Sequence, residues 1–244
     1  MVYDGIKVEA FWLLAQNRFN NSKEFYEENK AEINRTVINP MRQIAAILGP
    51  EMLKIDPMAN VVPTKMVSRI RRDTRYTNDK TLYREHVWIM FMRPKALWEN
   101  HPCIWFEISS GGYSYGVGFF DQKPALMEFF RKKLLEDTDS FLQAKEYVEK
   151  SGAILSADLY KREKRSDLDA QIKNIYNAKT FYFIAENKNI QNLEDERIIK
   201  ELKKAFKNFA PMYKYLLKIA DEFLAFDEEL QEAKLKENTV KYEF

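Results

Sequence analysis

The residues best suited to chemistry lie between positions 65 and 86, where basic side chains are concentrated. Residues 65–84 hold seven lysines and arginines against two aspartates, a net charge of +5 in a chain whose total is +2. The planar guanidinium of arginine matches two oxygens of a phosphate or carboxylate at once. This cluster predicts a site for a small anionic, phosphate-bearing ligand. The residues expected to contact that ligand are Arg69, Arg72, Arg75, Lys80 and Tyr83.

Acidic residues in the same stretch can play two different roles. Asp73 and Asp79 could orient the arginines toward the ligand. Together with Glu107, they could instead hold a divalent ion beside a phosphate, which makes a metal-assisted phosphoester hydrolase or transferase an alternative. His86 is a candidate proton carrier, although a lone histidine at a strand start is commonly a hydrogen-bonded structural residue. We assign no metal and no cofactor.

The same residues also allow a purely structural interpretation. Arg72 alternates with Ile70 toward the side expected to face the core, where an arginine is usually paired with a carboxylate. Asp73, Asp79 and Glu107 are the available partners. The Arg-Asp signature would then clamp an irregular loop to a sheet in a structural or interaction domain. Residue chemistry alone leaves both interpretations open, and with them the question of whether the protein is an enzyme.

Several standard sites have no counterpart in the sequence. It contains no Gly-x-x-x-x-Gly-Lys loop, no Gly-x-Gly-x-x-Gly turn after a strand and no Gly-x-Ser-x-Gly elbow. The single cysteine, Cys103, lies in an apolar run and is expected to be a buried structural thiol in a reducing compartment. The longest convincing apolar run, 87–92, is too short to span a membrane. We therefore expect a cytoplasmic protein without membrane contact, and the small net charge disfavours nucleic acid as a partner.

Hydrophobic spacing predicts helices at both ends of the chain and strands in the middle. A helix over 6–19 precedes a second one that starts at Asn21, kinks or breaks near Asn39 because of Pro40, and ends at Gly49-Pro50. From Met66 the period becomes two, which predicts a strand that runs into a polar loop. Further strands are expected over 87–92, 103–109, 113–120, 154–160 and 181–184, with a tight hairpin at Gly111-Gly112.

The remaining helices are expected over 124–135, 137–150, 167–176, 194–208 and, after a break at Pro211, 212–230. The chain from about 234 is expected to fray. Helices at both ends around a set of antiparallel strands indicate the α+β class. We predict a single domain over 1–244, with a central, mostly antiparallel sheet on which N-terminal and C-terminal helices pack.

Aromatic residues follow the basic cluster closely. They could line a pocket beside the arginines, although core packing explains most of them better because they alternate along strands. This set comprises Trp88, Trp98, Trp105, Tyr113, Tyr115, Phe119 and Phe120.

The basic stretch also resembles the signature of an uncharacterised family, the domain of unknown function numbered 2461. The resemblance is carried by Ser68-Arg69-Ile70-x-Arg72-Asp73-x-Arg75-Tyr76-x-x-Asp79-Lys80-Thr81-x-Tyr83-x-x-His86 and extends to Phe11-x-x-Leu14-x-x-Asn17, Tyr113-x-x-Gly116-x-Gly118 and Pro211-Met212-Tyr213. Leu82 and Val117 depart from the pattern, at positions where the family usually has proline and a glycine run. The resemblance implies a single α+β domain and brings no established activity.

Overall fold

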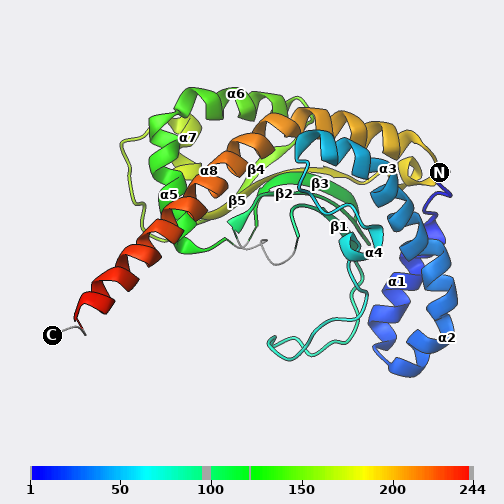
Figure 1. The fold of residues 1–244 in the computed structure, drawn as a ribbon. Coiled ribbons are helices and arrows are strands. Elements are labelled where there is room, and N and C mark those ends of the chain that lie inside the picture. Colours follow the sequence, from blue (N-terminus) through cyan, green and yellow to red (C-terminus); the bar gives the residue numbers. More distant parts are fainter. Residues whose placement is uncertain (1, 95–99, 121, 242–244) are drawn as a thin grey trace.

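The protein is an α+β structure built on one five-stranded antiparallel sheet (Figure 1). The computed structural model describes residues 2–94, 100–120 and 122–241. The strands are ordered β1-β2-β3-β5-β4 across the sheet, and every neighbouring pair is antiparallel. Their bounds are β1 Val87–Phe91, β2 Cys103–Ser109, β3 Gly112–Phe119, β4 Ile154–Leu159 and β5 Ala178–Asn187.

Helices precede, interrupt and follow the strands. The N-terminal set is α1 Val8–Asn20, α2 Lys23–Ile33, a π-helical turn Asn34–Ile38, α3 Asn39–Ile55 and the short α4 Pro63–Met66. The later set is α5 Pro124–Glu136, α6 Thr138–Glu149, α7 Ala170–Tyr176, a 3-10 turn Ile190–Glu194 and α8 Arg197–Lys241. No helix in the described ranges is long and apolar enough to cross a membrane.

One face of the sheet forms the floor of the hydrophobic core. Residues alternate along each strand, so that Val87, Ile89 and Phe91 of β1 are fully buried while Trp88 and Met90 are only partly so. Helix α8 packs on β2 and β3, α3 on β1, and α5 on β5. One continuous core results, running from the N-terminal segment to α8.

The opposite face of the sheet, which we call the outer face, has no helix over it in the described chain. Figure 1 shows α3, α5, α6 and α8 on one side of the sheet only. The alternation of buried and partly exposed residues in β1, β2 and β5 agrees with a sheet that has one covered and one open face.

Two of the three predicted helix interruptions are wrong. The helix α3 continues through Gly49-Pro50 to Ile55, and α8 continues through Pro211. Gly49 is buried against Val61, where a Cβ would lie 3.3 Å from the Val61 Cβ, so this glycine serves packing rather than a helix end. At Pro211, buried side chains on both sides, Phe209 and Met212, hold the helix to the core and offset the missing hydrogen bond. Near Asn39, where a kink or break was expected, the structure has a π-helical turn over Asn34–Ile38, and the helical backbone continues through it into α3.

The hairpin between β2 and β3 is confirmed, whereas the strand expected from Met66 is not a regular strand. Met66 ends α4, and residues 67–86, which we call the arm, form an irregular hairpin with only two isolated bridges, Val67–Ile89 and Arg71–Tyr83. Just beyond the Arg71–Tyr83 bridge, toward the tip of the arm, the Arg72 amide donates to the Leu82 carbonyl at 2.7 Å. The arm extends from the β1 edge beside α1 and α2, away from the side of the sheet that α8 covers (Figure 1).

Candidate functional site

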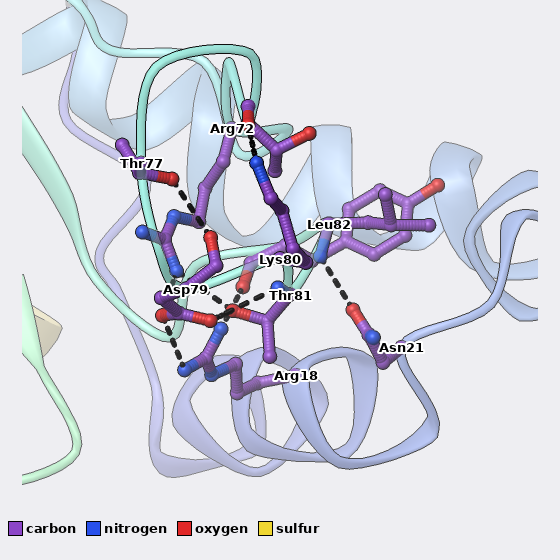
Figure 2. Close-up of polar contacts among 10 residues, drawn as sticks. Arg18, Asn21, Arg72, Thr77, Asp79, Lys80, Thr81 and Leu82 are labelled. Carbon is purple, nitrogen blue, oxygen red and sulfur yellow. Dashed lines mark hydrogen bonds and ion pairs between the residues drawn. The ribbon is translucent and has the colours of Figure 1, made fainter.

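The Asp79 carboxylate joins the two legs of the arm. One oxygen contacts Nη1 of Arg72, which comes from the outgoing leg (Figure 2). The other accepts from the amide and hydroxyl of Thr81, on the returning leg, at 2.9 and 2.6 Å. The Arg72 Nη1 also donates to the Thr81 hydroxyl at 2.7 Å. The Thr81 hydroxyl and amide, followed by Arg72, hold the pKa of Asp79 well below its usual value.

Helix α1 holds the arm from outside through Asp79 and the returning leg. Arg18 contacts the Asp79 carboxylate at 3.3 Å and donates to the Tyr83 carbonyl at 3.1 Å. The Asn21 side chain accepts from the Leu82 amide at 2.6 Å (Figure 2). Asn21 has a φ of 49° and lies at the C-terminal end of α1. The predicted start of the second helix at Asn21 is therefore wrong by one residue, because Ser22 caps α2 by accepting from the Phe25 amide.

At the tip of the arm, two of the predicted ligand contacts have local partners. Arg75 donates from Nε and Nη2 to both oxygens of Asp73, at 2.9 and 2.7 Å, and this pairing lowers the pKa of Asp73 to about 2. Lys80 donates to the Thr74 carbonyl at 2.9 Å. Asp73 and Asp79 thus pair with Arg75 and Arg72 separately, rather than holding the two arginines toward one point.

Tyr83 is part of the packing beneath the arm. Its side chain is buried and its ring stacks on Tyr26 of α2, with ring centroids 4.9 Å apart and an interplanar angle of 23°. Burial raises the pKa of the Tyr83 phenol. Through this stacking and the Arg18 bond to its carbonyl, Tyr83 contacts both α1 and α2 from the returning leg.

A different set of arginines forms the cationic part of the arm. Arg69 and Arg71 are exposed, while Ile70 between them is buried, as the alternation predicted. Nη1 of Arg84 donates to the carbonyls of Arg69 and Arg71 at 2.8 and 3.2 Å. Within the described residues, no carboxylate pairs with any of these three guanidinium groups. Partial burial lowers the pKa of Arg84, and the nearby charge of Arg72 lowers it further.

The remaining candidates lie where the arm meets β1 and β2. His86 has Nδ1 3.3 Å from the Glu107 carboxylate, and its ring meets the edge of Trp88 with centroids 5.3 Å apart. Glu107 therefore faces His86, while Asp73 and Asp79 face arginines. Among the residues that the structure describes, no group of three or more histidine, cysteine or acidic side chains is placed to hold a metal ion.

The predicted aromatic set divides between the two faces of the sheet. Its members Tyr113, Tyr115 and Phe119 are buried in the core, Trp88 and Trp105 are partly exposed on the outer face, Phe120 is exposed, and Trp98 lies outside the described residues. The Cys103 thiol is buried, as expected, and burial raises its pKa to about 12. Such a thiol is a poor nucleophile.

An ionic cluster that sequence reasoning missed lies at the other end of β1. Arg93 donates to Asp56, after α3, at 3.0 Å and to Asp221 of α8 at 2.7 Å. The Tyr213 hydroxyl donates to the same Asp56 oxygen at 3.0 Å, and His101 Nε2 lies 3.3 Å from Asp221. The two carboxylates that Arg93 contacts are 37 and 128 positions away from it in the sequence, so no local pattern connects them. The cluster ties three separate elements together.

The fold and the arm define an α+β protein whose sheet carries an ordered, arginine-rich hairpin at its β1 edge. A family model described as conserved hypothetical protein, DUF2461, matches residues 9–215, which include the arm, the sheet and most of the helical layer. The chain belongs to this family, as its sequence signature indicated. No curated protein matches the chain.

Proposed function

We propose that this protein binds a small anionic, phosphate-bearing ligand on the arm, through Arg69, Arg71 and Arg84. The observation that carries the proposal is the pair of bonds from the Arg84 side chain to the Arg69 and Arg71 carbonyls, which holds one guanidinium against the backbone that carries two further exposed arginines. Arginines on one segment that have no carboxylate partner favour a bound anion, because each guanidinium can still donate two hydrogen bonds to its oxygens.

Contacts between the two legs of the arm fix the segment that carries these arginines. Arg72, Asp79 and Thr81 fix the register of the two legs, and Arg18 ties Asp79 to α1. A ligand would therefore meet a preformed site, which reduces the conformational entropy lost on binding. In this proposal Arg69 is retained from the predicted set. Arg72 supports the site from below, while Arg75, Lys80 and Tyr83 order the arm.

Binding of inorganic tripolyphosphate, measured by calorimetry at low ionic strength, tests the proposal. Substituting both exposed arginines, Arg69→Ala with Arg71→Ala, should weaken binding by about tenfold or more, since a hydrogen bond to a charged group contributes about 1.5–3 kcal/mol. Affinity should also fall as salt is added, because exposed charges are screened.

Arg75→Ala is compared with Arg69→Ala alone as the matched control, because each variant removes one charge from the arm and Asp73 already neutralises Arg75. We expect its affinity to stay within about twofold of the parent. Equal losses of tripolyphosphate affinity in the two variants would mean that net charge, and not the position of the arginines, determines binding. No binding of tripolyphosphate to the parent protein would exclude the proposed site.

A further inference from the structure

A row of apolar side chains crosses the outer face of the sheet next to the arm. Residues directly opposite one another on paired strands are Met90 and Trp105, Trp105 and Gly116, Gly116 and Ile184, and Ile184 and Ile154. These five positions therefore form one line across all five strands. Ile154, at the end of the row, is 70% exposed. The row lies on the side of the sheet that the described helices leave open.

Trp105 lies along the surface of the sheet rather than standing upright from it. A Cβ built on Gly116 would lie 2.3 Å from Cη2 of the Trp105 indole and 2.4 Å from its Cζ2. The six-membered ring of Trp105 thus occupies the space above Gly116, on the neighbouring strand. Only a glycine leaves that space. The result is a flat aromatic floor at the centre of the outer face.

Two further aromatic rings stand beside this floor. The Tyr182 ring meets Trp105 at 88°, with centroids 5.2 Å apart. Phe120, which is 54% exposed, lies 6.3 Å from Tyr182. A floor with a perpendicular wall fits a planar ring, which can stack on the indole and meet the tyrosine edge to face. We call Trp105, Tyr182 and Phe120 the aromatic corner.

The cationic part of the arm reaches the same face through Trp88. The Arg84 guanidinium lies 4.8 Å from the centroid of the Trp88 ring. Trp88 precedes Met90, a member of the row, by two residues on β1, and Met90 is paired with Trp105. Because the Trp105 ring lies above Gly116 on β3, strand spacing places it roughly 12 Å from the backbone of Trp88. A ribose followed by a phosphate chain can bridge such a distance.

From this geometry we infer that the ligand of the arm is a nucleoside phosphate, whose base stacks in the aromatic corner while its phosphates contact Arg69, Arg71 and Arg84. This inference rests on the proposed anion site and names its ligand class. A purely apolar partner on the outer face would leave the three guanidinium groups without a counter-charge. A ringless anion would leave the aromatic corner empty. A nucleoside phosphate satisfies both surfaces.

Calorimetry with ATP and with tripolyphosphate, both without magnesium, tests the inference. ATP should bind about tenfold or more tightly than tripolyphosphate, since base-aromatic stacking contributes about 1–3 kcal/mol. Trp105→Leu should remove this difference and leave tripolyphosphate binding unchanged, and Trp105→Tyr should keep part of it. Tyr182→Leu removes the perpendicular ring of the aromatic corner and should likewise lower the preference for ATP over tripolyphosphate. Trp12→Leu, at a tryptophan of α1 that is 68% exposed, is the control and should change neither affinity.

The possible failures are distinguishable. Tripolyphosphate binding with no preference for ATP, or an ATP preference that survives both Trp105→Leu and Tyr182→Leu, would overturn the nucleoside inference and leave the anion site intact. Failure of both compounds to bind would overturn the anion site itself. If a single-stranded oligonucleotide binds more than about tenfold tighter than ATP, the ligand is a nucleic-acid strand rather than a mononucleotide.

Discussion

The Arg72 guanidinium meets the Asp79 carboxylate between the two legs of the arm, and the same carboxylate contacts Arg18 of α1. One acidic side chain therefore closes the hairpin and fastens it to the N-terminal helices. Its position follows from the register of the arm, in which the Arg72 amide bonds to the Leu82 carbonyl and brings the residues before Leu82 opposite Arg72.

The first prediction concerns this contact. Asp79→Asn keeps the shape of the side chain but removes the charge that Arg72 and Arg18 share, so the arm should open more often while the sheet stays folded. Cleavage of the native protein by trypsin within residues 67–86 should become about five- to tenfold faster. Asp73→Asn is the control, because Asp73 holds only Arg75 at the tip. Equal cleavage rates in the two variants would show that Asp79 does not fasten the arm.

A second prediction follows from the stacking of Tyr83 on Tyr26. Tyr83→Ala removes a buried ring between the arm and α2, and the free energy of unfolding should fall by about 3–5 kcal/mol, as for other buried aromatic residues. Tyr83→Phe keeps the ring and should cost less than about 1.5 kcal/mol. Urea denaturation measures both. A large loss in the phenylalanine variant would instead assign the stabilisation to the hydroxyl group.

The third prediction concerns acid. Asp73 has a pKa lowered to about 2 because Arg75 donates to it, and the pKa of Asp79 is lowered as well. A carboxylate with a lowered folded-state pKa stabilises the fold above its unfolded pKa of about 3.9, and this contribution disappears as the pH falls through the folded value. The arm contacts should therefore persist down to about pH 4 and weaken progressively below it.

Carboxyl carbon chemical shifts, followed by NMR during an acid titration, measure these pKa values directly. Asp73 should titrate with a midpoint near 2, and Arg75→Ala should move that midpoint toward the ordinary 3.8. Arg72→Ala should raise the pKa of Asp79 only in part, because the Thr81 hydroxyl and amide are the larger causes of its shift. An Asp73 midpoint at 3.8 in the parent protein would show that the pair with Arg75 does not form in solution.

Local patterns predicted much of the architecture because each depends on a few neighbouring residues. The period-two pattern placed Ile70 inside and Arg69 and Arg71 outside, and the burial of these residues agrees. Gly111-Gly112 predicted the hairpin, in which Gly112 has a φ of +130° and a Cβ would lie 2.3 Å from the Asn187 carbonyl oxygen. Pro50 and Pro211 led to wrong predictions of helix ends, because a helix can continue through a proline when the residues on both sides of it are packed in the core.

Which carboxylate each arginine uses could not be predicted from the sequence. Asp73, Asp79 and Glu107 were all available to Arg72, and only the register of the arm selects Asp79. Arg84 was part of the basic stretch, but its link to Arg69 and Arg71 depends on the folded arm. The partner of each arginine depends on the folded structure, because backbone pairing decides which side chains lie close together and distance along the sequence does not.

The last prediction concerns the ionic cluster at the far end of β1. Asp56 is 1% exposed, and Arg93 is the cation that neutralises it, while Tyr213 donates to the same oxygen. Arg93→Met should lower the free energy of unfolding by about 3–5 kcal/mol, because it leaves a buried charge uncompensated. Adding Asp56→Asn removes that charge and keeps an acceptor for Tyr213, so the double variant should recover at least about half of the loss.

Urea denaturation of the single and double variants measures this coupling. Arg165→Met is the matched control, because Arg165 pairs with Asp167 at the surface and water already solvates both groups; its stability should hardly change. A double variant no more stable than Arg93→Met alone would mean that Arg93 acts through the packing of its side chain. Recovery on removing the Asp56 charge would instead show that the charge of Arg93 holds β1, the segment after α3, and α8 together.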